Sequence, residues 1–288
     1  MAKENKSAER EGIVFPYPKE GFFDEGLPKG VLSPSGFGMY LRCARQFEYA
    51  YVQGIRKAPA IAMLKGTCIH HAVELTHKHT MKHGTPLNIE AATQALSDSF
   101  DAEEDQIEDA TKEEKGQVKD AAIKGLHVYH RDAVPLITPV AAEKPFAIKV
   151  GTVPFRGVID LIDKVPGEYS LEDDPDQPPP KVEVVSDLKT TKRMWIPQML
   201  AQNAQMTFYA IAENTNLVRV DFVLDQKSGI KYVAKRTTRD RNMKRLLVED
   251  AEEVSHLIKQ GVFPRCSPTE WNCSERFCGF YKECRGPK

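Results

Sequence analysis

The sequence lacks an apolar run of the roughly 20 residues that a helix needs to cross a bilayer. Residues 1–11 are polar and charged, so they also lack the apolar stretch of a secretory signal. These absences argue against a membrane-spanning helix and against secretion. We therefore expect a cytoplasmic protein, encoded by a cell or by a virus.

The chain also lacks a net charge of either sign, because 40 Lys and Arg residues oppose 41 Asp and Glu residues. Net charge therefore neither indicates nor excludes nucleic-acid binding, and any phosphate-binding surface must be a local concentration of basic side chains. Internal repeats of solenoid length are absent too. With 288 residues, of which 41% are hydrophobic, the chain is long enough to bury a large core.

Hydrophobic periodicity predicts an α/β fold. Helices are expected where apolar residues recur at helical spacing and caps mark the ends: from Pro34, over about 60–83, within 91–136, over about 197–213 and over 239–260. Strands are expected where β-branched residues cluster between glycines or prolines: 146–150, 153–163, 181–188, 218–224 and 231–235. The acidic, proline-rich run 172–181 predicts an exposed hairpin loop rather than a domain linker.

Two neighbouring strands of this prediction carry carboxylates. Asp160 lies on the first, and Asp187 on the next, with Lys189 on the same face because side chains alternate along a strand. If the strands pair, the acids suit a hard divalent cation and the lysine can hold a phosphate or a water. Either acid alone is better explained as a strand-end turn residue. Gln205 and Tyr209, four residues apart on one face of the following helix, can reach the same place and favour a site.

Four motifs carry a family resemblance. Gly157-Val158-Ile159-Asp160, Asp187-Leu188-Lys189-Thr190 and Gln205-Met206-Thr207-Phe208-Tyr209 resemble, in order and spacing, the core motifs of RecB-like PD-(D/E)XK nucleases, and Gly66-Thr67-Cys68-Ile69-His70 resembles their upstream Gly-x-x-x-His motif. The resemblance covers about 31–284 and implies a restriction-endonuclease-like α/β core, a mixed sheet flanked by helices. We expect a flexible segment, 1–30, and then a single domain, 31–288, with a helical part, 31–138, a catalytic core, 139–262, and a cysteine segment, 263–288.

The resemblance also implies the chemistry of the site. One or two Mg²⁺ or Mn²⁺ ions are expected to be bound by His70, Asp160, Asp187 and the backbone carbonyl of Leu188. Lys189 is expected to orient the attacking water, and Gln205 and Tyr209 to contact DNA or to order the site. His71 adjoins His70, and helical geometry alone does not separate the two histidines.

Six cysteines in an intracellular chain of this length argue against a disulfide scaffold and favour metal ligation or redox chemistry. Cys273, Cys278 and Cys284 stand close together near the end of the sequence and suit a soft metal or an iron-sulfur centre. Cys43 resembles the single N-terminal cysteine that completes a 4Fe-4S cluster in AddB-type and CRISPR-adaptation nucleases. Zinc is the alternative occupant, and Cys266 is a competing ligand.

Basic residues recur near the acids and define an expected DNA-binding surface: Lys192, Arg193, Arg239 and Arg241. The last two open a long helix, and a solvated helix face explains them equally well. Trp195 can stack on a base of a single strand, or it can be packing.

We expect an exonuclease that hydrolyses phosphodiesters at DNA ends in recombination or repair, with partner proteins from those processes. A site-specific endonuclease shares the chemistry and differs in recognition. A DNA-binding structural subunit that keeps the fold without turnover is a further alternative, and the intact acids and lysine count against it.

Overall fold

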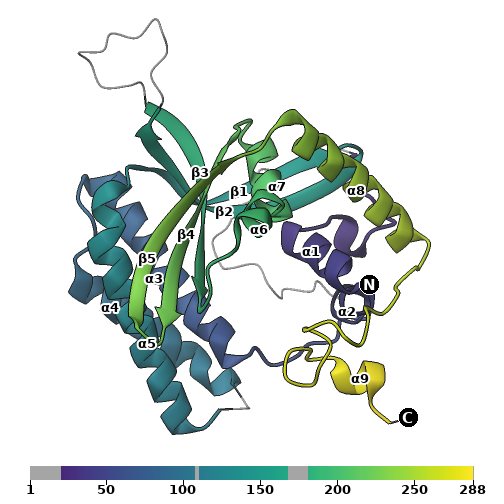
Figure 1. The fold of residues 1–288 in the computed structure, drawn as a ribbon, viewed down its shortest axis with the longest axis horizontal. Coiled ribbons are helices and arrows are strands. Elements are labelled where there is room, and N and C mark those ends of the chain that lie inside the picture. The colour runs from purple at the N-terminus through teal and green to yellow at the C-terminus, as the bar shows by residue number, and fades with distance from the viewer. Residues whose placement is uncertain (1–20, 108–109, 168–180, 288) are drawn as a thin grey trace, which may run out of the picture.

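The computed structural model describes residues 21–107, 110–167 and 181–287 (Figure 1). At its centre is a five-stranded sheet in the order β1-β2-β3-β4-β5. The strands are β1 (Pro139–Val150), β2 (Val153–Pro166), β3 (Lys181–Thr191), β4 (Leu217–Gln226) and β5 (Gly229–Thr238). Only the β3–β4 pair is parallel among these strands. The expected α/β class with a mixed sheet is therefore confirmed.

Helices cover both faces of the sheet (Figure 1). On one face, α3 (Ile61–His83), α4 (Ile89–Glu103) and α5 (Lys112–Asp132) share a hydrophobic core with Leu161, Leu188 and Val223 of the strands. On the other lie α1 (Pro34–Arg42), α2 (Ala44–Phe47), α6 (Pro197–Ala201), α7 (Ala204–Ala212) and α8 (Arg241–Lys259), which form two further clusters. A last short helix is α9 (Tyr281–Arg285). No helix of the described residues is both long and apolar enough to span a membrane.

The sequence signals for helix ends are confirmed at two points. Ser33 caps α1 by accepting a hydrogen bond from the backbone N–H of Gly36 at 3.0 Å, and Pro34 takes the first helical position. Gly84 ends α3 in the left-handed conformation, with φ of 77°.

Two expected helices differ in extent. The helix expected over 197–213 is two helices, because the side chain of Asn203 accepts a hydrogen bond from the N–H of Met206 and caps a new start. The helix expected from residue 239 begins at Arg241, after an Asp240 cap. The loop expected at 172–181 lies outside the described residues up to residue 180, as does the segment expected to be flexible up to residue 20.

Candidate active site

Asp160 and Asp187 lie where the backbone ladder between β2 and β3 ends. The last paired residues are Leu161 and Ser186, so the two aspartates face each other one step beyond the ladder. There the side chain of Asp160 replaces a backbone partner, because its Oδ2 accepts the N–H of Leu188 at 3.0 Å. The end of the ladder therefore turns two carboxylates toward a common point.

His70 reaches these acids from α3. Gly66 permits the approach, since a β-carbon there would lie 3.3 Å from Thr190 Oγ1, closer than side chains ordinarily pack. One helical turn later, His70 Nδ1 lies 3.3 Å from Asp160 Oδ2. Burial lowers the pKa of His70 and favours the neutral imidazole, which is the form that binds metals. His71 instead lies 3.9 Å from Glu74 and has a more exposed side chain.

Glu143 of β1 completes a group that the sequence did not reveal. The ligand atoms of His70, Glu143 and Asp160 all lie within 4.8 Å of one another. Glu143 is buried and has a left-handed backbone, with φ of 50°, in the middle of a strand. A non-glycine residue in this conformation costs on the order of 1–3 kcal/mol and is typical of functional sites. The sequence predicts a strand that begins only at residue 146, so it does not place Glu143 on a strand.

Asp187 is 1% exposed, yet neither of its side-chain oxygens accepts a hydrogen bond of normal geometry from the described residues. Lys189 Nζ lies 2.7 Å from Oδ2 and forms an ion pair with it. Burying a carboxylate is costly, and the ion pair with Lys189 offsets part of that cost. Carboxylates together with one imidazole fit Mg²⁺ or Mn²⁺, so these residues suit such an ion.

Lys189, Gln205 and Tyr209 form a chain of hydrogen bonds. Lys189 Nζ donates to Gln205 Oε1 at 3.2 Å, and Gln205 Nε2 donates to the Tyr209 hydroxyl at 2.7 Å. Burial lowers the pKa of Lys189, but the carboxylates of Asp187 and Asp160 outweigh burial and raise it above its ordinary value. Lys189 is therefore a cation held in one orientation beside the acids.

The basic residues do not all face solvent. Lys192, Arg193 and Arg241 are exposed, as a phosphate-binding role requires. Arg239 is fully buried, with Nε donating to Thr207 Oγ1 at 2.9 Å. The expectation that Arg239 belongs to a DNA-binding surface is therefore wrong, because its side chain is enclosed by the protein.

A buried polar network adjoins the acids. Asp221 accepts hydrogen bonds from the Tyr232 hydroxyl at 2.7 Å and from Arg219 Nε at 3.0 Å, while His77 Nε2 lies 2.9 Å from the Tyr129 hydroxyl. His77, Tyr129 and Asp221 line the same cavity as His70 and Asp160. The network therefore stabilises the side chains that line this cavity.

The His77→Gln variant is expected to lose stability less steeply in acid than the wild-type protein. Burial lowers the pKa of His77 to about 4, despite the opposing charge of Asp221. Between pH 6.5 and pH 4 the unfolded chain therefore binds the proton more readily, and this residue alone costs the fold about 3 kcal/mol as the pH falls through that window. Denaturant titrations at pH 7, 5.5 and 4.5 measure the difference. Parallel losses in both proteins would contradict the assignment.

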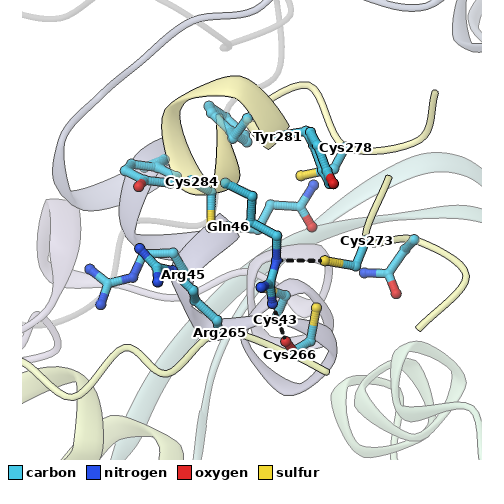
Figure 2. A pocket seen from close by; sticks show the side chains of 13 residues that line it. Cys43, Arg45, Gln46, Arg265, Cys266, Cys273, Cys278, Tyr281 and Cys284 are labelled. Carbon is cyan, nitrogen blue, oxygen red and sulfur yellow. Dashed lines mark hydrogen bonds between the residues drawn. The ribbon is translucent and has the colours of Figure 1, made fainter. Parts of the chain in front are cut away.

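Five of the six cysteines surround one cavity between the end of α1 and the segment after α8 (Figure 2). They are Cys43, Cys266, Cys273, Cys278 and Cys284, and all are free thiols. Cys68 is fully buried in α3. The structure thus brings the four predicted ligands together and adds Cys266 to them.

The two chain segments that carry these thiols pack directly on each other. The N–H of Arg45 donates to the carbonyl of Pro264 at 3.0 Å, and the rings of Tyr49 and Phe280 stack with centroids 5.6 Å apart. Arg285 Nε donates to Cys273 Sγ at 3.1 Å. Burial raises the pKa of Cys43, but hydrogen bonds to its sulfur, first from the backbone of Cys266, lower it below the ordinary value. These hydrogen bonds favour the thiolate of Cys43, the form in which cysteine binds metals. Burial instead raises the pKa of Cys266 to about 12 and also raises that of Cys278.

Comparisons with known proteins agree with this geometry. Among solved structures, that of an exonuclease candidate from Eubacterium rectale aligns with a TM-score of 0.53 and 12% identity over 96% of each chain, which shows the fold alone. The structure of SSO0001 aligns with a TM-score of only 0.32, at 14% identity over 87% of this chain and 94% of that one, and carries no argument. No curated protein matches the sequence. The family model of the PD-(D/E)XK nuclease superfamily matches residues 31–285. The chain therefore belongs to the PD-(D/E)XK nuclease superfamily.

Proposed function

We propose that this protein is a RecB-like deoxyribonuclease that uses Mg²⁺ or Mn²⁺ to hydrolyse phosphodiesters at DNA ends, in recombination or repair. The observation that carries the proposal is the group formed by His70, Glu143 and Asp160, whose ligand atoms lie within 4.8 Å of one another, together with the buried ion pair of Asp187 and Lys189. A metal-dependent active site explains why these ionisable groups are gathered in one place.

The position of each residue in the site indicates its role. His70, Glu143 and Asp160, whose ligand atoms lie within 4.8 Å of one another, would hold the metal. The family resemblance adds Asp187 and the carbonyl of Leu188 to these ligands. When bound, the metal supplies positive charge that polarises a phosphate and acidifies water. Lys189 places its ammonium group where it can donate to a phosphate oxygen or orient the attacking water. Gln205 and Tyr209 keep that ammonium group in place.

We further propose that Cys43, Cys273, Cys278 and Cys284 hold a 4Fe-4S cluster. Their convergence on one cavity supports a shared centre, and zinc is the alternative occupant.

A nuclease assay with end-labelled linear DNA and closed circular DNA tests the proposal. The wild-type protein should degrade the linear substrate with Mg²⁺ or Mn²⁺, stop when EDTA is added, and leave the circle intact. An Asp160→Ala variant should be inactive, while Glu249→Ala, which changes an exposed carboxylate of α8, should match the wild type. Cutting of the circle would make the protein an endonuclease. Undiminished activity of Asp160→Ala would overturn the site.

A further inference from the structure

A short apolar ridge stands on the surface beside the candidate active site. It consists of Met194, Ile196 and Met199, whose exposed fractions are 42%, 57% and 52%. Single exposed apolar residues are ordinary, but three within six residues are a concentrated patch, and such patches mark contact with another molecule.

Trp195, between Met194 and Ile196 in the sequence, faces inward and anchors the ridge to the sheet. Its ring packs edge-on against that of Phe222, with centroids 5.6 Å apart. Phe222 is the residue of β4 paired with Lys189 of β3, and neighbouring strands lie about 4.8 Å apart. Trp195 and Phe222 also share a hydrophobic cluster with Tyr209, which orders Gln205. The segment that carries the ridge is therefore anchored to the sheet position next to Lys189, and Met194 and Ile196 follow Lys189 in the chain by five and seven residues.

Buried hydrogen bonds hold the other end of the ridge. Arg239 NH2 donates to the carbonyl of Leu200 in α6 at 2.8 Å, while Nε of the same guanidinium donates to Thr207 of α7. Burial lowers the pKa of Arg239 to about 10, so the cation is kept there at some cost in solvation. A buried arginine therefore holds the backbone of the last turn of α6, the helix that carries Met199.

Charge next to the ridge identifies its occupant. The exposed Lys192 and Arg193 directly precede it, and Lys227 lines the same surface hollow as these two. Basic side chains next to apolar ones suit a nucleic-acid strand, because its phosphates are negatively charged and the faces of its bases are apolar. A protein partner seated on the ridge would cover the rim of the site at Lys189. Nucleobases are the occupant that is compatible with an open site.

We propose that Met194, Ile196 and Met199 press against the terminal bases of duplex DNA and hold the strands apart, so that one strand enters the active site. This inference rests on the proposed nuclease function and adds to it a preference for the form of the substrate. Apolar side chains placed against a base step unstack it, and the terminal pair of a duplex is the easiest to open.

Two measurements on an Ile196→Ser/Met199→Ser variant test the ridge. The first compares degradation of a blunt duplex with degradation of the same strand alone. The second follows the fluorescence of 2-aminopurine placed at the duplex end, which rises when the base unstacks, during binding by proteins that also carry Asp187→Ala and cannot cut. The matched control is Met81→Ser/Leu136→Ser, which removes one methionine and one aliphatic residue that are similarly exposed on other elements.

The ridge variant should degrade the blunt duplex at least about tenfold more slowly than the control, degrade the single strand within about threefold of it, and lose the fluorescence rise. Equal losses on both substrates, or no loss on either, would overturn the ridge proposal. A wild-type protein that cuts neither substrate would instead refute the nuclease function. The fluorescence measurement needs no cleavage, so it still decides on the ridge in that event.

Discussion

The Asp187→Asn variant is expected to degrade DNA at least about 10³-fold more slowly than the wild type while binding it unchanged. The substitution preserves shape but removes the negative charge that pairs with Lys189 and that would bind the metal. The variant should also lose most of the stabilisation that Mn²⁺ gives the wild-type fold. That stabilisation is about 2.7 kcal/mol at a free metal concentration 100 times the dissociation constant.

Thermal melts with and without Mn²⁺ measure this second effect without any reference to activity. A Glu249→Gln variant, altered on the exposed face of α8, should melt and cut like the wild type. If Asp187→Asn kept the full rise in melting temperature with Mn²⁺, Asp187 would not be a ligand. Loss of activity with intact metal stabilisation would then place its role in orienting Lys189 alone.

Anaerobically purified wild-type protein is expected to be brown and to carry about four irons per chain, and Cys284→Ala should lose both. The thiols join the segment after α1 to the segment after α8, so loss of the cluster should also loosen these segments. Limited proteolysis should then cut within 263–287 before it cuts the sheet. Metal analysis and the visible spectrum report on the cluster directly.

Cys68→Ala is the matched control, because Cys68 is buried in α3 away from the other thiols. This variant protein should keep its iron. A Cys266→Ala variant decides whether Cys266 replaces one of the four proposed ligands: we expect it to keep its iron, and Cys273→Ala to lose it. A colourless wild-type protein with stoichiometric zinc would refute the cluster.

The sequence was sufficient for the parts of the site that follow from regular periodicity. Asp187 and Lys189 share a strand face, and Gln205 and Tyr209 share a helix face, so the pattern alone predicts that each pair lies together. The structure joins the two pairs through the hydrogen bond from Lys189 to Gln205. Family motifs, rather than periodicity, were needed to choose His70 over its neighbour.

Irregular backbone and burial explain what the sequence did not reveal. Glu143 adopts a left-handed conformation inside β1, and no local pattern marks such a position in advance. Arg239 precedes an exposed basic helix and looks like its first residue, but the Asp240 cap starts the helix later and the guanidinium turns inward. The break before Asn203 was likewise hidden, because apolar residues continue across it at helical spacing. The burial of Arg239 depends on contacts with Leu200 and Thr207, which are distant in sequence, whereas the break at Asn203 is a local cap.

The cavity that joins Cys43 to the four later thiols imposes an order on how the protein is made. A ribosome releases Cys43 long before Cys284, and the nascent chain must keep that first thiol reduced and unoccupied in the meantime. Residues 139–238, which contain the whole described sheet, can assemble during this interval. Insertion of the proposed cluster would therefore be a late event in biogenesis. A cell short of iron would then accumulate chains whose sheet is folded and whose thiols hold no cluster.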